Sequence, residues 1–299
     1  KYEEFQLYKG KVIVRFYPLS HMYYVSVDGG KFVRKGGVTG IIGIKDKSRP
    51  LQIWQQQITA DFLMGCLDAK KIINEDLIVE AIMQCDIQKE EAADIGKEIH
   101  AWCEHHIRHK LKQKGYEKVP PVPDFPEALT GVNSFLKWEK ENKVKWITTE
   151  RPVYSKKYDY IGTMDFEAVI NGLHCAGDFK SSNGLYNGVR MQIEAYASAD
   201  EEEIGKKKYD GRWAVRLSKY TEKEYIKREQ RKAEIKEAIA RVQGKEYKNY
   251  GIKPYQVFEA QFLDNEKGSR AYDMEAFLAA KTLKDWDYAT DPFTNGGVL

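Results

Sequence analysis

Two runs of alternating apolar and polar residues, separated by Asn171-Gly172, lie at the centre of the chain. Asn-Gly between such runs is the strongest short-range signal for a two-residue hairpin loop. The pattern therefore predicts an antiparallel hairpin over residues 160–180. Counting outward from the loop, the expected pairs are Ile170 with Leu173, Val169 with His174, Glu167 with Ala176 and Asp165 with Asp178.

The two faces of this predicted hairpin differ in chemistry. The opposite face from the core carries Asp165, Asp178 and Lys180. Directly opposed side chains have Cβ atoms roughly 4.5–5.5 Å apart, so two carboxylates placed this way call for a cation between them. The alternative is a different register, or a solvated pair that Lys180 merely neutralises. The apolar face belongs to the core and is formed by Phe166, Ala168, Ile170, Leu173, Cys175 and Phe179.

The remaining pattern predicts strands and helices on both sides of the hairpin. Alternation over residues 4–27 indicates a small hairpin or meander, and further strands are expected at 146–154, 211–218 and 255–263. Caps and apolar spacing predict helices over 48–64, 74–84, 89–112, 126–142, 187–203, 221–243 and 273–288. The order predicts an α/β fold: a mixed central sheet flanked by helices, with N-terminal β-strands and a charged helical insertion.

Two helical spacings place polar residues on one face. Gly96, His100 and Glu104 recur every four residues, and Gly96 lets another backbone approach His100. The alternative is a partly buried histidine on a packed helix. Gln192 and Tyr196 are also four apart on one face, although such a pair is more often a surface or half-buried feature.

Composition narrows the class of protein. The 299 residues include 48 Lys and Arg against 45 Asp and Glu, a net charge of +3. This excess of positive charge is too small to indicate nucleic-acid binding by itself, so the evidence for such binding must come from local basic patches. Four cysteines lack CxxC spacing, which favours reduced thiols in an intracellular, cytoplasmic protein. The sequence contains no run of eighteen apolar residues, the length that would predict a membrane-spanning helix.

Four motifs follow one another in the middle of the chain. They are G-x-x-x-H at Gly96–His100, G-T-M-D at Gly162–Asp165, D-F-K at Asp178–Lys180 and Q-I-E-A-Y at Gln192–Tyr196. In this order they resemble the PD-(D/E)xK nuclease superfamily, in its RecB-type and phage exonuclease branch. The N-terminal stretches V-D-G-G and G-V-T-G-I-I also look similar to phage-type and mitochondrial genome-maintenance exonuclease-like proteins. The resemblance covers residues 96–196 well and the rest loosely. Met164 stands where the superfamily name has proline, a departure common among RecB-type members.

The resemblance implies a fold and a domain arrangement. It implies a restriction-endonuclease-like core, with residues 46–299 as one compact nuclease domain and residues 1–45 as a β-rich segment packed on it. It also implies a role for each motif residue. His100, Asp165 and Asp178 would bind Mg²⁺ or Mn²⁺, as two ions, Lys180 would position or activate the attacking water, and Gln192 and Tyr196 would steady the site and the nucleic-acid end.

Two further positions bear on this implied site. Glu150 matches an acidic position that relatives often carry one strand earlier. Some relatives hold an iron–sulfur cluster with one early and three late cysteines, but no cysteine follows Cys175 here, so that cluster is not expected.

The expected function is a metal-dependent deoxyribonuclease, a phage or prophage exonuclease in recombination, repair or DNA processing in the bacterial host cytoplasm. Its partners would be linear duplex or single-stranded DNA ends and a single-strand annealing or recombination protein. The alternatives are a structure-specific or restriction-like endonuclease, and a non-catalytic DNA-binding or recombination partner that keeps the fold.

A basic, aromatic loop precedes the strand that carries Asp165. Its residues Lys156, Lys157, Tyr158 and Tyr160 are expected at the rim of the active site. There, lysines can neutralise phosphates and an aromatic ring can stack on a frayed base. The alternative is an ordinary solvated turn.

Overall fold

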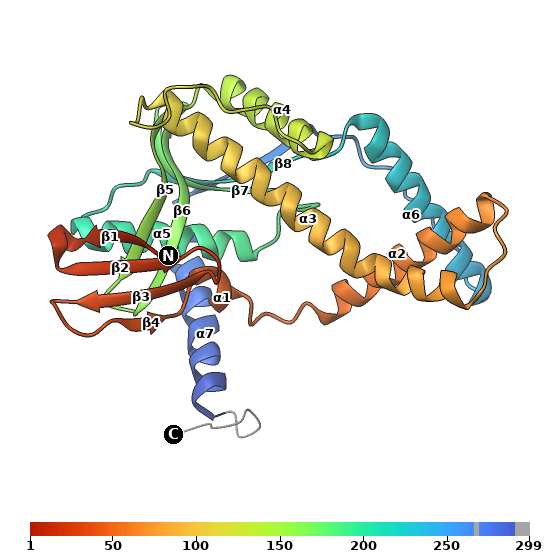
Figure 1. Ribbon diagram of the computed structural model, residues 1–299, viewed down its shortest axis with the longest axis horizontal. Helices are drawn as coiled ribbons and strands as arrows, with labels where there is room; N and C mark the ends of the chain where they lie inside the picture. The colour runs from red at the N-terminus through yellow and green to blue at the C-terminus, as the bar shows by residue number, and fades with distance from the viewer. Residues whose placement is uncertain (266–268, 291–299) are drawn as a thin grey trace.

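The computed structural model describes residues 1–265 and 269–290, except for the side chains of 288–290. Within these residues, helices flank two β-sheets in an α/β arrangement (Figure 1). The first sheet is an antiparallel meander in the order β1-β2-β3-β4, as the N-terminal alternation predicted. Its strands are β1 (Glu3–Leu7), β2 (Val12–Tyr17), β3 (Met22–Val27) and β4 (Val33–Lys35).

The second sheet is mixed and carries the predicted hairpin. Its strand order is β5-β6-β7-β8-β9, in which only β7 and β8 are parallel. A parallel pair needs a long crossover, and α5 (Gly188–Ile204) provides it. The strands are β5 (Lys145–Ser155), β6 (Tyr160–Ile170), β7 (Leu173–Lys180), β8 (Gly211–Leu217) and β9 (Phe258–Asp264).

The β6–β7 hairpin has the register that its Asn-Gly loop predicted. Asn171 and Gly172 both have positive φ, 51° and 88°, as a two-residue hairpin loop of type I′ requires. The paired residues include Ile170 with Leu173, Val169 with His174 and Glu167 with Ala176. The side chain of Leu173 is 42% exposed beside the turn, so its expected place in the core is wrong.

The ladder between β6 and β7 ends before it reaches the two aspartates. Its last pair is Phe166 with Gly177, so Asp165 and Asp178 lie one step beyond it. There the backbone N–H of Phe179 donates a hydrogen bond to Oδ2 of Asp165 at 2.8 Å. A side chain of β6 thus takes the place of a backbone acceptor where the hairpin approaches its open end.

The helices differ from the sequence prediction in one respect. The segments 74–84 and 89–112 belong to one helix, α3 (Glu75–Lys110), because residues 85–88 contain no proline or glycine. Asn74 caps it by accepting a hydrogen bond from the backbone N–H of Leu77. The other helices are α1 (Val38–Ile42), α2 (Ser48–Asp68), α4 (Pro126–Glu141), α6 (Glu222–Val242) and α7 (Ser269–Thr290).

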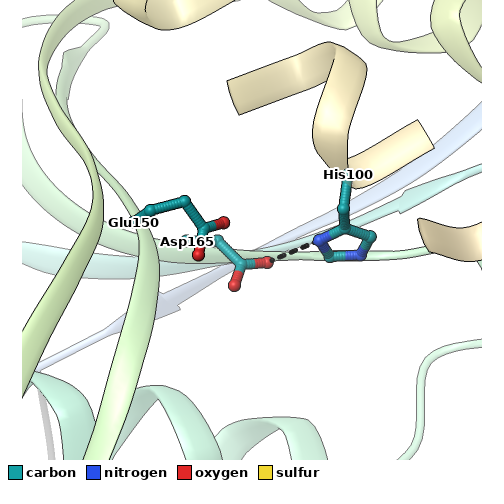
Figure 2. Close-up of side chains that lie close together, drawn as sticks. All are labelled: His100, Glu150 and Asp165. Carbon is teal, nitrogen blue, oxygen red and sulfur yellow. Dashed lines mark ion pairs between the residues drawn. The ribbon is translucent and has the colours of Figure 1, made fainter. Parts of the chain in front are cut away.

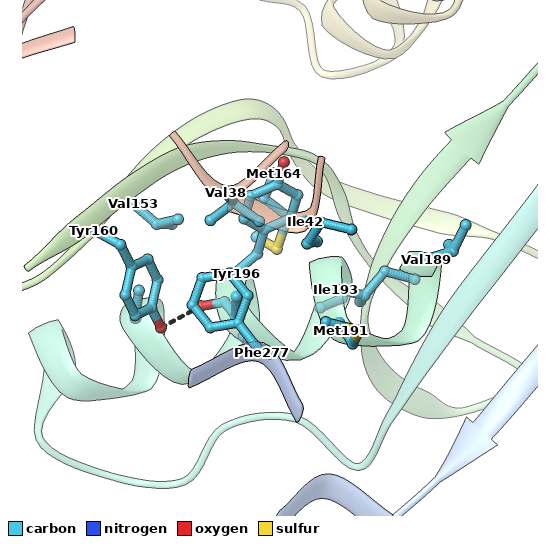
Figure 3. Close-up of a cluster of buried hydrophobic side chains, with 14 of the residues drawn as sticks. Val38, Ile42, Val153, Tyr160, Met164, Val189, Met191, Ile193, Tyr196 and Phe277 are labelled. Carbon is cyan, nitrogen blue, oxygen red and sulfur yellow. Dashed lines mark hydrogen bonds between the residues drawn. The ribbon is translucent and has the colours of Figure 1, made fainter. Parts of the chain in front are cut away.

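Apolar clusters fill both faces of the mixed sheet. On one face, α3 and α4 pack over Phe166, Cys175 and Phe179. On the other face, α1, α5 and α7 contribute to a second cluster (Figure 3). The mixed sheet is therefore covered by packed apolar side chains on both faces.

The N-terminal segment and the helices have two further features. Gly37 of the N-terminal segment forms a parallel bridge with Ile161, which ties the segment to β6. None of the helices within residues 1–265 and 269–290 combines the length and the apolar character needed to cross a bilayer.

Candidate functional site

Three potential metal ligands converge from three different elements. His100 comes from α3, Glu150 from β5 and Asp165 from β6, and their ligand atoms all lie within 4.8 Å of one another (Figure 2). Nδ1 of His100 is 3.5 Å from Oδ2 of Asp165. Two carboxylates and one imidazole form a donor set suited to Mg²⁺ or Mn²⁺. The carboxylates suit both ions, and the imidazole favours Mn²⁺.

Glu150 reaches this group through an unusual backbone conformation. Its φ is +47°, although it lies inside strand β5. The residues on either side, Thr149 and Arg151, pair with Phe166 and Met164, so Glu150 lies opposite Asp165. The left-handed region costs a residue with a side chain roughly 1–2 kcal/mol, and such strain is concentrated at functional sites.

Asp178, which is buried, and Lys180, which is half-buried, form an ion pair next to this group. Nζ of Lys180 lies 2.5 Å from Oδ2 of Asp178, which is completely buried. Beyond this ion pair, neither carboxylate oxygen of Asp178 accepts a hydrogen bond from any residue that the structure describes. Buried oxygens without donors are rare, and a cation is one way to satisfy them.

The structure groups the acidic residues differently from the sequence prediction, which named His100, Asp165 and Asp178 as the metal ligands. The compact group contains Glu150 in place of Asp178. Asp178 is nevertheless close enough for the charge of Asp165 to raise its pKa, after burial. The signal for Glu150 in the sequence was its acidic character one strand before Asp165.

Burial and mutual repulsion determine the protonation of these groups. Burial and the charge of Asp165 raise the pKa of Glu150 to about 9. Burial and Asp165 raise the pKa of Asp178 to about 6, and burial also raises the pKa of Asp165. Burial and Lys180 lower the pKa of His100 to about 4, which keeps the imidazole in the neutral form that binds metals. Buried carboxylates in mutual repulsion fit a bound divalent cation.

Two glycines allow the elements of the site to approach one another. A Cβ on Gly96 would lie 2.8 Å from Oγ of Ser181, so the glycine lets the end of β7 approach α3 one turn before His100. The close neighbour is thus a side chain, not the backbone that the sequence suggested. A Cβ on Gly162 would lie 2.4 Å from the ring of Tyr196.

Gln192 and Tyr196 meet on α5 as their spacing predicted. Nε2 of Gln192 donates a hydrogen bond to the hydroxyl of Tyr196 at 2.9 Å. The Tyr196 ring is buried in the cluster of Figure 3. Burial, and then Asp178 and Asp165, raise the pKa of Tyr196 well above its usual value, so the side chain stays a neutral phenol beside the acidic groups.

The basic, aromatic loop that contains Lys156, Lys157 and Tyr158 contacts the N-terminal segment and α5. Lys156 lies over the ring of Tyr8 at 4.7 Å, and the backbone N–H of Lys157 donates to Glu202. Nζ of Lys157 lies 4.8 Å from the ring centre of Tyr158. The loop therefore packs on the N-terminal segment and the end of α5.

Tyr160 does not lie at the rim of the site. Its ring is completely buried, and its hydroxyl donates to the carbonyl oxygen of Ala195 at 2.8 Å (Figure 3). The expectation that Tyr160 contacts nucleic acid is therefore wrong, because inward alternation of β6 places this ring in the core. Five residues of strand, about 17 Å at 3.3 Å per residue, separate it from Asp165.

No family model and no curated protein matches this chain. The assignment of a function therefore depends on the geometry of His100, Glu150, Asp165, Asp178 and Lys180.

Proposed function

We propose that this chain is a metal-dependent deoxyribonuclease that degrades DNA from its ends, built on a restriction-endonuclease-like core. The observation that carries the proposal is the group of His100, Glu150 and Asp165 next to the ion pair of Lys180 with the buried Asp178. The mixed sheet with its α5 crossover supports the core that the resemblance implies. Phosphodiester hydrolysis needs such a combination of carboxylates and a fixed cation.

The proposed cofactor is Mg²⁺ or Mn²⁺, held by His100, Glu150 and Asp165. For the second ion of the proposal, Asp178 is the remaining carboxylate. A divalent cation polarises the phosphoryl group and lowers the pKa of a nearby water.

Lys180 supplies a fixed positive charge where negative charge develops on the phosphoryl oxygens. Burial alone would lower its pKa, but Asp178 and Asp165 raise the pKa above the usual value for lysine. The ammonium group therefore stays protonated at neutral pH. This favours a role in orienting water and stabilising charge over a role as the general base.

The neighbouring residues hold these groups in place. The backbone N–H of Phe179 donates to Oδ2 of Asp165 and fixes the orientation of this carboxylate. The hydroxyl of Thr149 donates to the carbonyl oxygen of Asp165 at 2.7 Å and fixes the backbone beside Glu150. Tyr196, held by Gln192, closes the α5 side with a neutral ring.

The test compares cleavage of end-labelled linear DNA with that of a closed circle of the same sequence, with Mg²⁺, Mn²⁺ or EDTA. We expect metal-dependent loss of the linear form only. Cleavage of both forms would indicate an endonuclease. Binding without cleavage in either metal would indicate a non-catalytic DNA-binding protein. Asp178→Asn is the matched control, because it removes one charge and preserves the shape of the side chain.

A further inference from the structure

A cavity of about 550 Å³ lies at the carboxyl ends of β7 and β8. The loop that follows Lys180, helix α6 and the segment 253–256 form its walls. Crevices at the carboxyl ends of strands are common ligand sites, and ligand cavities measure roughly 300–1,000 Å³. The size and place of this cavity therefore suit a small ligand or one unit of a polymer.

The cavity adjoins the candidate active site. Arg216, one of its lining residues, is the partner of Lys180 in the parallel β7–β8 ladder. Laterally paired residues project from the same face of a sheet, and neighbouring strands lie about 4.8 Å apart. The cavity thus begins one strand spacing from the lysine of the Asp178–Lys180 pair.

Positive charge exceeds negative charge along the cavity wall. Arg216 is paired with Glu259 at 3.0 Å, and Lys232 with Glu229 at 2.5 Å. Two further lining cations, Arg228 and Lys253, form no ion pair with any residue in 1–265 or 269–290. Their charges remain available to an anion.

Arg228 is oriented by a ring instead of a carboxylate. Its guanidinium carbon lies 4.3 Å from the centre of the Tyr220 ring. A cation held over a ring keeps its charge, and its N–H groups in the plane remain free to bind phosphate oxygens in pairs.

Two more tyrosines form an aromatic wall that is fixed in place. The rings of Tyr225 and Tyr255 have centres 5.6 Å apart. The hydroxyl of Tyr225 donates to the carbonyl oxygen of Lys253 at 3.1 Å, and that of Tyr255 to the carbonyl oxygen of Tyr220 at 2.6 Å. Rings held this way need little ordering when they contact a flat ligand.

We infer that this cavity binds the nucleotide next to the cleaved bond of a single DNA strand. The phosphate lies on Arg228 and Lys253, and the base lies against Tyr225 or Tyr255. Stacked aromatic rings combined with cations are how proteins hold unpaired strands. The inference rests on the proposed nuclease function, because the strand reaches the cavity from a phosphodiester at Lys180. A free nucleoside monophosphate offers the same chemistry.

The test measures binding of a fluorescein-labelled single strand by anisotropy in Ca²⁺ across a range of salt concentrations. We expect Arg228→Ala/Lys253→Ala to weaken binding and to flatten the salt slope by about 0.7, since the one phosphate that these two cations hold is no longer neutralised. The matched control is Lys223→Ala/Lys227→Ala, which removes two exposed charges from α6 outside the cavity and should lower the slope less. Cleavage of bis(4-nitrophenyl) phosphate, a diester without nucleotides, should be unchanged in the control variant, and it reports whether the catalytic group itself is active.

A wild-type salt slope in the cavity variant would overturn the cavity inference, and the nuclease proposal would stand if the small diester and linear DNA are still cleaved. Conversely, wild-type protein that cleaves neither would overturn the proposed function, whereas loss of strand binding in the variant would still support the cavity. If the cavity variant binds labelled deoxyadenosine monophosphate more weakly than wild type but binds the labelled strand as wild type does, the assignment of the cavity to a strand is overturned. If circular dichroism shows that the double variant is unfolded, the single variant Lys253→Ala, at an exposed residue, decides: it should weaken strand binding and flatten the salt slope.

Discussion

The ring of Tyr196 occupies the space that a side chain at Gly162 would need, with its nearest carbon 2.4 Å from the Cβ position. This contact links the G-T-M-D motif on β6 to the Q-I-E-A-Y motif on α5. The spacing of each motif is local, but the two residue types depend on each other. A glycine on the strand permits a buried aromatic ring on the helix, beside Asp165 and Asp178.

Gly162→Ala should therefore destabilise the protein by about 1–3 kcal/mol, the usual cost of overpacking a core. The cause is collision with the Tyr196 ring. Urea denaturation measures the loss. In a Tyr196→Ala background the same substitution should cost much less, because the two residues are in contact. Equal costs in both backgrounds would show that the ring is not the obstacle.

Glu150→Gln should affect metal binding and stability in opposite directions. Calorimetry with Mn²⁺ should show roughly a tenfold or greater loss of affinity, since even outer-sphere partners of a metal contribute 10–100-fold. In EDTA the same variant should be more stable than wild type, because burial and Asp165 hold the pKa of Glu150 at about 9, and folding at neutral pH then has to protonate a carboxylate that Gln does not carry. Glu141→Gln, an exposed change on α4, is the matched control and should alter neither quantity. Unchanged Mn²⁺ affinity in Glu150→Gln would remove Glu150 from the metal group.

Lys180→Met should destabilise the protein by about 3–5 kcal/mol, because it leaves Asp178 buried without its cation. Adding Asp178→Asn to this variant should restore much of the stability, since no unpaired charge then remains. DNA cleavage should be absent both in Lys180→Met and in the double variant. Guanidinium denaturation and the linear-DNA assay separate the two effects. A double variant no more stable than Lys180→Met would contradict the assigned ion pair.

The hairpin at the centre of the fold was predictable because its register depends on two adjacent residues. Asn171-Gly172 fixes the turn, and the turn fixes every pair up to Phe166 and Gly177. The break predicted within α3 was wrong because the weak apolar pattern of residues 85–88 does not stop a helix that lacks proline and glycine there.

Other features of the site could be recognised only in the three-dimensional structure. Glu150 lies beside His100 because its own backbone is left-handed and because the register of β5 shifts between Trp146 and Thr148. Both features break the simple alternation of a strand. Tyr160 follows a loop of basic and aromatic character as the first residue of β6, and its ring packs against Phe277 of the distant α7. Local sequence cannot show which of several tyrosines a later helix will cover.

Acid should weaken a second cluster of charges that joins α5 to α7. Both guanidinium nitrogens of the Arg270 fork bind the Glu201 carboxylate, at 3.1 and 2.9 Å, and the backbone N–H groups of Lys208 and Tyr209 also donate to it. Burial alone would raise the pKa of Glu201, but these hydrogen bonds and the charge of Arg270 lower it from 4.5 to about 2.

Because the folded-state pKa lies below the unfolded one, the Glu201 carboxylate stabilises the fold above the unfolded pKa of 4.5 and loses this effect as pH falls towards 2. Glu201→Gln should therefore lower the free energy of unfolding at about pH 6, and the difference from wild type should shrink by about pH 3. Urea denaturation at both pH values measures it, with exposed Glu141→Gln as control. A difference that stays constant between the two pH values would mean that the carboxylate is not held by Arg270 in the folded protein.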